Sequence, residues 1–196
     1  MSKGRLEAFS DGVIAIIITI MVLELQVPHQ PDLAALRPLL PKFLSYVLSF
    51  VYLGLYWNNH HHLMQAARQV NGSVLLANLH LLFWLSLIPF VTGWMGENDF
   101  AKLPMAFYGG VLWMCGLAYY ILVHTLIAHH GKDSVLAAAI GKDEKGIRSM
   151  YIYTAGIALA FVLPWASGAL YVLVAIMWLI PDRRIENKLA KAGPGE

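Results

Sequence analysis

The sequence predicts an all-α membrane protein with six transmembrane helices per subunit. Apolar residues make up 58% of the chain, against roughly 45–50% in an ordinary soluble domain. Charged residues make up 13%, which is about half the usual share. The apolar residues are gathered into runs long enough to cross a bilayer, with short polar breaks between them. A soluble fold of this length could not bury so much apolar surface.

Helix periodicity and stop signals define the expected spans. They lie near residues 5–27, 42–64, 73–95, 104–130, 148–165 and 167–181. Pro28 and Pro31 end the first span, and residues 164–168 leave only a tight reversal before the last one. We therefore expect one membrane domain over residues 1–182 and a short charged cytoplasmic tail over residues 183–196.

Lys and Arg are unequally divided between the two sides that these spans define. One side would carry Lys3, Arg5, Arg68, Lys132, Lys142, Lys145, Arg148, Arg183, Arg184, Lys188 and Lys191, and the other Arg37, Lys42 and Lys102. Because cytoplasmic loops are enriched in Lys and Arg, both termini are expected to be cytoplasmic.

Several functions are excluded by what the sequence lacks. The net charge is only +2 and no basic stripe with interleaved aromatic residues is present, so nucleic acid is not expected as a partner. No zinc-protease, nucleophile-elbow or phosphate-loop motif occurs, so we do not expect an enzyme. His60, His61 and His62 follow one another, and successive helical residues point about 100° apart, so one helix cannot direct all three at one metal ion. No cofactor is expected.

The first span, from Arg5 onward, has two different faces. On a helical wheel, one narrow stripe consists of Gly12, Ile16, Thr19 and Leu23. Asp11 lies roughly a quarter turn from this stripe, and Ser10 lies nearly opposite it. The stripe fits lipid contact or core packing as well as a pore. Ser10 and Asp11, by contrast, need hydrogen-bond partners inside the protein.

Partners for these polar groups occur at the same membrane depth in the second and third spans. We expect a buried hydrogen-bond network that includes Trp57, His60, His61 and Asn78. For Asp11, a structural salt bridge or helix cap and a transport role are both open readings.

Three sets of residues resemble a known family. Arg5, Phe9, Ser10 and Asp11 form R-x-x-x-F-S-D at the start of the first span. Tyr56-Trp57 is followed by His60-His61 in the second, and the third carries Asn78 through Ser86, Pro89, Phe90 and Thr92. With the six-span length, the sequence resembles the prokaryotic members of the transmembrane protein 175 family, relatives of the lysosomal potassium channel of animals.

The resemblance implies a potassium-permeable channel, a homotetramer in which each subunit contributes its first helix to a central pore. It implies a hydrophobic gate on that helix in place of a carbonyl selectivity filter, with Ile16 as the constriction and Thr19, Leu23 and Gly12 also lining the pore. Arg5, Ser10 and Asp11 would belong to the network that holds the helix against its own subunit. The resemblance also implies the partners of the protein: permeant potassium or other monovalent cations, the lipid bilayer of a prokaryotic cell membrane and the other subunits.

Two other functions fit the same residues. A proton-coupled secondary transporter would use Asp11 and the histidines as a proton relay, although no inverted repeat is visible. A membrane scaffold without transport activity is the other alternative. On the wheel Glu24 points away from the stripe, and no role is assigned to His62 or His80.

Overall fold

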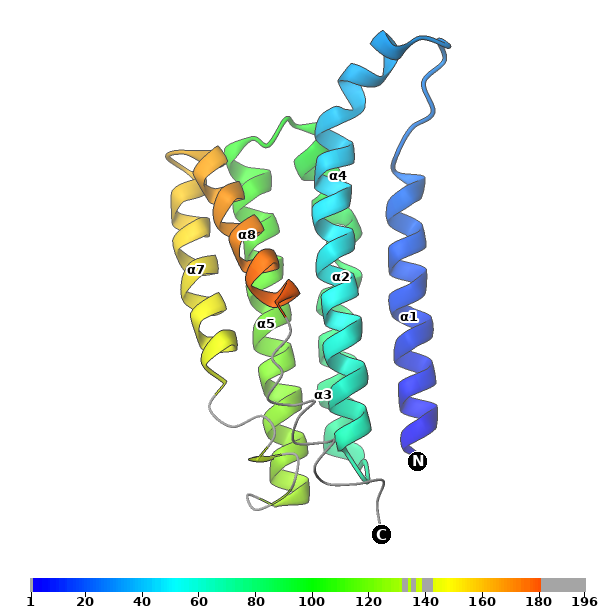
Figure 1. Ribbon diagram of the computed structural model, residues 1–196, viewed down its shortest axis with the longest axis vertical. Helices are drawn as coiled ribbons and strands as arrows, with labels where there is room; N and C mark the ends of the chain where they lie inside the picture. Colours follow the sequence, from blue (N-terminus) through cyan, green and yellow to red (C-terminus); the bar gives the residue numbers. More distant parts are fainter. Residues whose placement is uncertain (1, 132–133, 135–136, 139–142, 181–196) are drawn as a thin grey trace.

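The computed structural model describes residues 2–131, 134, 137–138 and 143–180, so the expected tail at 183–196 lies outside the described residues. The main elements are α-helices joined by short turns (Figure 1). In chain order they are α1 (Lys3–Leu23), η1 (Leu33–Leu39), α2 (Leu40–Ala66), α3 (Gly72–Ser86), α4 (Ile88–Glu97), α5 (Lys102–His130), α7 (Glu144–Ala160) and α8 (Pro164–Leu179). The described part of the chain has no strand, which confirms the all-α fold.

Four helical segments among the described residues are long and apolar enough to cross a membrane. They are 3–23, 33–66, 72–97 and 102–130, whereas α8 is apolar but shorter. The hydropathy therefore supports the predicted multi-span membrane protein, with α7 and α8 as a shorter helical hairpin beside the longer helices.

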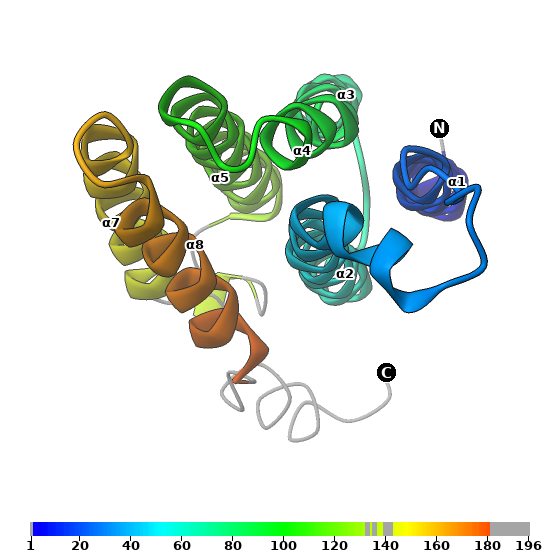
Figure 2. The same ribbon diagram turned by 90° about the horizontal axis from the view of Figure 1, so that it is seen from above.

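Helix α1 lies at one edge of the bundle, where it packs against α2, α3 and α4 (Figure 2). Helix α5 packs against α3 and α4, and α7 and α8 lie at the opposite edge. As a result, one face of α1 is covered by α2, α3 and α4, and the other has no neighbour among the described residues.

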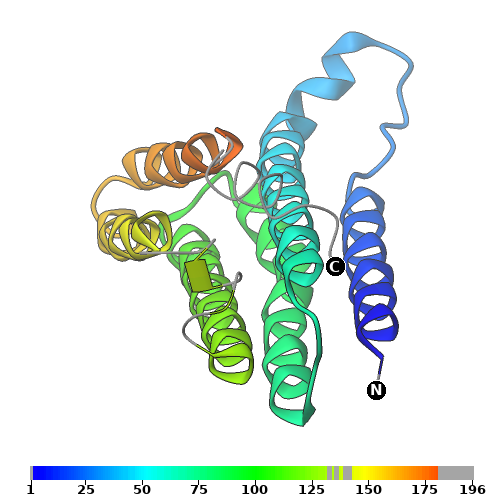
Figure 3. The same ribbon diagram turned by 60° about the horizontal axis from the view of Figure 1, so that its bottom comes forward.

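The start of α1, the α2–α3 turn and the end of α5 lie at the same end of the molecule (Figure 3). Lys3 and Arg68 therefore share this end, whereas Arg37 in η1 and Lys102 at the start of α5 lie at the other. These four residues are divided between the two ends as the sequence predicts; Lys132, Lys142, Arg183, Arg184, Lys188 and Lys191 lie outside the described residues.

Proline positions account for two differences between the expected spans and the observed helices. The segment expected at 73–95 is kinked at Leu87, because Pro89 has no N–H to continue the α-helical pattern and instead opens α4. The last turn lies at residues 161–163 rather than 164–168, because Pro164 is the first residue of α8, a position that favours proline.

Buried hydroxyl groups join the helices in the core. Thr92 Oγ1 donates to Ile88 O at 2.6 Å, so the hydrogen of Ser49 Oγ is directed at Thr92 Oγ1, 2.6 Å away. Ser49 Oγ then accepts from Tyr108 Oη at 2.9 Å. Tyr171 Oη donates to Met105 O at 3.2 Å. Each of these four hydroxyls has a partner, as groups inside membrane helices require, whereas the buried Ser167 Oγ has none among the described residues.

Gly109 allows α5 to approach the Tyr171 ring of α8 closely. A Cβ atom at residue 109 would collide with Tyr171 Oη and lie 2.5 Å from Tyr171 Cζ. Gly109→Ala is therefore expected to lower the free energy of unfolding by about 1–3 kcal/mol. Gly110→Ala is the matched control, since a Cβ there meets no atom within 4 Å. Unfolding in mixed micelles titrated with SDS would compare them, and equal stabilities would contradict the close approach.

Candidate functional site

The inner face of α1 is held to α3 by a buried chain of hydrogen bonds. Asn78 Nδ2 donates to Ser10 Oγ at 2.9 Å, and Ser10 Oγ donates to Leu6 O at 2.9 Å. Asn78 Oδ1 lies 2.8 Å from His60 Nε2 and can only accept, so this nitrogen carries the hydrogen. Ser10, His60 and Asn78 are fully buried. The structure thus joins three of the predicted network residues through the Asn78 amide.

His60 keeps one polar atom without a partner. Its Nδ1 is buried and makes no hydrogen bond among the described residues. The ring is therefore held only through Nε2, which makes its position depend on Asn78.

Asp11 and Trp57 form a second contact between α1 and α2. Trp57 Nε1 donates to Asp11 Oδ1 at 3.0 Å. Trp57 is partly exposed and Asp11 half-buried, so this bond lies at the edge of the interface rather than within it. Within one subunit, the Asp11 carboxylate has a structural hydrogen-bond partner.

Replacing Trp57 with phenylalanine removes the indole N–H and keeps a ring. We expect Trp57→Phe to lower the free energy of unfolding by about 1 kcal/mol, because the Asp11 carboxylate loses its donor. A double-mutant cycle with Asp11→Asn should give a coupling of about 0.5–1 kcal/mol in SDS titrations. Strictly additive effects would show that the bond does not stabilise the fold.

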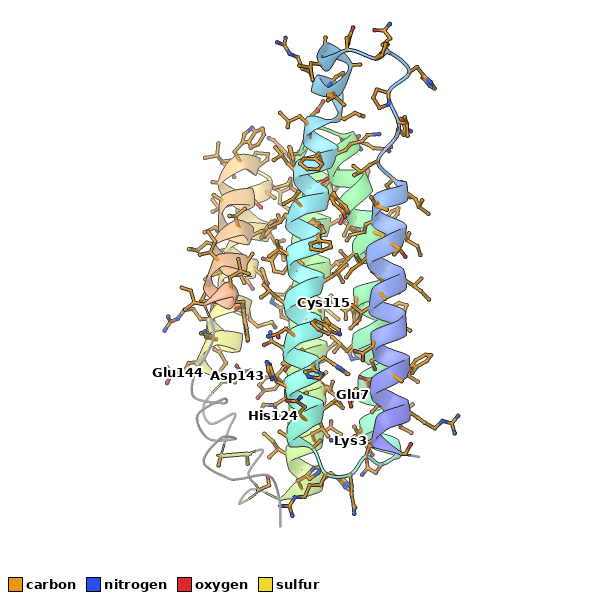
Figure 4. The ribbon with its side chains drawn as sticks, turned by 45° about the vertical axis from the view of Figure 1, so that its right-hand side comes forward. Lys3, Glu7, Cys115, His124, Asp143 and Glu144 are labelled. Carbon is orange, nitrogen blue, oxygen red and sulfur yellow. The ribbon has the colours of Figure 1, made fainter. Side chains whose placement is uncertain are left out.

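Lys3 and Glu7 also hold α1, although they were not predicted as site residues. His61 Nδ1 lies 3.3 Å from Glu7 Oε1, and Lys3 Nζ donates to Ala67 O at 3.0 Å. Figure 4 shows Lys3 and Glu7 on the side of α1 that faces α2. Lys3, Glu7 and Asp11 are spaced four residues apart, which places them on one face of the helix. This spacing is the pattern in the sequence from which a polar stripe could have been predicted.

Arg5 differs from the other predicted network residues. Its side chain is exposed and makes no hydrogen bond or ion pair with another described residue. The single subunit therefore does not bring Arg5 into the network.

The predicted pore stripe lies on the uncovered face of α1. Ile16 is 59% exposed and Leu23 is 79% exposed, and Gly12 and Thr19 are exposed as well. Thr19 Oγ1 donates to Ile16 O at 2.8 Å, so its hydroxyl hydrogen is engaged within the helix. The oxygen of Thr19 remains free to accept a hydrogen bond or contact a cation.

The buried face of α1 is equally well defined. It consists of Leu6, Ser10, Ile14, Ile17 and Met21. These residues alternate with the stripe at helical spacing, so one sequence pattern separates the anchoring face from the exposed face.

Glu24, His62 and His80 lie away from the stripe. Glu24 Oε2 lies 3.7 Å from the position of a Cβ on Gly93 of α4, so its carboxylate faces α4. His80 Nε2 accepts from Trp84 Nε1 at 2.9 Å within α3. His62 packs edge-on against His61, with ring centroids 5.8 Å apart. The described residues contain no cluster of three or more His, Cys, Asp or Glu that could hold a metal ion.

The bundle of apolar helices and the exposed stripe on its edge helix define a multi-pass α-helical membrane protein. Residues 5–89 match the sequence profile of the endosomal/lysosomal potassium channel TMEM175 family. A potassium channel of Chryseobacterium sp. (strain P1-3) is 56% identical over 189 residues, which are 96% of this chain and 98% of that protein. A potassium channel of Chamaesiphon minutus is 30% identical over 193 residues, covering 90% of this chain and 93% of its own.

The solved structures agree with these relatives. The crystal structure of a lysosomal potassium-selective channel TMEM175 homologue from Chamaesiphon minutus superposes with a TM-score of 0.78 at 28% identity, covering 91% of this chain and 96% of that one. The chain belongs to the TMEM175 potassium channel family. The family consists of channels, so the chain is not an enzyme and needs no cofactor.

Proposed function

We propose that the chain is the subunit of a potassium-permeable channel in which four copies surround a pore lined by α1. The uncovered stripe on α1 carries this proposal. Ile16 and Leu23 expose large apolar side chains on a helix whose other face is anchored to α2, α3 and α4. A helix that packs against its own subunit on one face and is exposed on the other is suited to line a pore between subunits.

Ile16 would form the narrowest part of this pore. A ring of isoleucine side chains offers no oxygen atoms to replace the hydration shell of an ion, so passage depends on pore diameter and wetting. Potassium is less strongly hydrated than sodium and loses its water at lower cost. Selectivity from such a hydrophobic gate would be moderate, and the Thr19 oxygen beyond it would ease partial dehydration.

Gly12 is suited to the cytoplasmic entrance of the pore. A Cβ at this position would meet no atom of its own subunit within 4 Å, so the residue leaves open space on the uncovered face. Four glycines around an axis would widen the entrance before the Ile16 constriction.

The orientation follows from the charges at the two ends of the bundle. Lys3 and Arg68 lie at the end that would face the cytoplasm, and Arg37 and Lys102 at the opposite end. Because the sequence predicts more Lys and Arg on the side that carries Lys3 and Arg68, both termini would be cytoplasmic in the cell membrane of a prokaryote.

Flux from liposomes tests the function directly. Purified protein in liposomes with a potassium gradient should carry a current that follows the membrane potential and does not saturate with concentration. Native mass spectrometry of the same preparation should show a tetramer. Saturable flux that ignores the membrane potential would indicate a transporter, and no flux at all would indicate a scaffold.

A further inference from the structure

A cavity lies between α2, α5, α7 and α8, on the side of the bundle away from the uncovered stripe of α1. Its volume is about 300 Å³, which is within the size range of small-molecule sites. None of the residues of the α1 stripe or of the α1 anchoring network lines it. We propose that this cavity binds a small organic ammonium ion, an apolar amine with a positively charged head.

Aromatic rings make up much of the cavity wall. Tyr56 comes from α2, Tyr119 from α5, Tyr153 from α7 and Trp178 from α8. Tyr56 and Tyr119 pack edge to face, with ring centroids 6.2 Å apart. Aromatic faces from several helices around one space attract organic cations through cation–π interactions.

Two polar side chains on the wall have no hydrogen-bond partner among the described residues. The Tyr56 hydroxyl makes no hydrogen bond with another described residue, and neither does the side-chain amide of Asn59. Other polar groups are already paired: Tyr119 Oη donates to Asn59 O at 3.1 Å, and Trp178 Nε1 donates to Ser149 Oγ at 2.9 Å. Because a hydroxyl and an amide can each donate and accept, these groups do not distinguish donors from acceptors, and the selection of a ligand rests on the aromatic rings and on charge.

Among the described residues that line the cavity, Asp143 is the one that carries a formal charge. Its Oδ1 accepts from Gly146 N at 3.0 Å and so caps α7, but the carboxylate makes no ion pair with a described residue. Figure 4 shows Asp143 at the start of α7, far from α1. A carboxylate without an ion-pair partner among the described residues favours a cationic ligand over an anionic one.

Two positive features near the cavity have partners of their own. The Lys145 ammonium donates to Ile180 O at 3.0 Å and lies 5.9 Å from the centroid of the Trp178 ring. The amide groups at the N-terminus of α7 are capped by Asp143. Asp143 lines the cavity, whereas Lys145 is not among the residues that line it.

Benzyltrimethylammonium is a suitable probe, and neopentylbenzene is its uncharged isostere. Equilibrium dialysis of the radiolabelled cation against the full chain in lipid nanodiscs, with empty nanodiscs as the blank, should show saturable binding. Neopentylbenzene should compete only weakly. Because binding is measured without ion flow, the outcome does not depend on whether the chain conducts potassium.

Asp143→Asn keeps a capping oxygen for Gly146 and removes the charge, so the fold should be preserved. We expect about tenfold weaker binding of the cation, an effect between those of exposed and buried ion pairs. Asp32→Asn is the matched control, because Asp32 Oδ1 likewise caps η1 through Ala35 N at 2.8 Å and does not line the cavity. This control should bind like the wild type.

Tyr56 separates the contribution of the ring from that of the hydroxyl. Tyr56→Phe keeps the aromatic face and should retain most of the binding, whereas Tyr56→Leu should weaken it several-fold. The proposal is overturned if binding above empty nanodiscs does not saturate, if Asp143→Asn binds like the wild type, or if neopentylbenzene competes as well as the cation. The last result would mean that the cavity accepts any apolar molecule.

Discussion

Asn78→Leu is expected to destabilise the subunit by about 1–3 kcal/mol, because leucine keeps the size of asparagine but makes no hydrogen bond. His60 would then have neither ring nitrogen paired in a buried position, since its Nδ1 already lacks a partner among the described residues. Ser10 would keep its bond to Leu6 O and lose its link to α3. The loss therefore falls on the contact between α1 and α3.

Asn58→Leu is the matched control for this substitution. Asn58 is exposed on α2 and makes no hydrogen bond through its side chain to a described residue, so its replacement should change stability by less than about 0.5 kcal/mol. Unfolding in SDS titrations and the fraction of tetramer in size-exclusion chromatography would compare the two variants. If Asn78→Leu proved as stable as Asn58→Leu, the buried network would not be what anchors α1.

The sequence was sufficient to predict the helical membrane fold and the two faces of α1. Hydropathy and the helix period determine both, and neither depends on which residues meet across an interface. The spacing of Ser10 from Ile16 already assigns them to different faces, and the structure buries the first and exposes the second.

The individual partners could not be predicted in the same way. Membrane depth places His60, His61 and Asn78 near Ser10, but the rotation and tilt of α2 and α3 decide which side chains meet. Those angles result from packing along the whole length of the helices, which is why His61 meets Glu7 rather than Asn78. The helix is also interrupted at Leu87, between α3 and α4, and periodicity does not predict this interruption.

The two faces of α1 also predict different consequences of mutation. A polar substitution on the anchored face disrupts contacts inside the subunit. A polar substitution on the uncovered stripe leaves those contacts intact and changes only the polarity of the exposed surface. Ile16 is the position where this difference should be largest, because it lies on the stripe directly beside the buried Ile17.

Ile16→Asn is expected to increase potassium conductance at least about tenfold, which corresponds to a barrier lower by about 1.4 kcal/mol. Amide groups would hydrate the constriction and remove its dewetting barrier, so sodium would also pass more easily and the potassium-to-sodium permeability ratio would fall. Single-channel currents in planar bilayers with potassium on one side and sodium on the other measure both quantities.

Val22→Asn provides the control on the same helix. Val22 is 46% exposed but lies about a quarter turn from the stripe, so the same polar group would be placed away from the proposed axis. If α1 lines the pore through Ile16, only Ile16→Asn changes conductance and selectivity. If both variants behave like the wild type, the stripe faces lipid, and the narrowest part of the pore must be formed by another surface of the subunit.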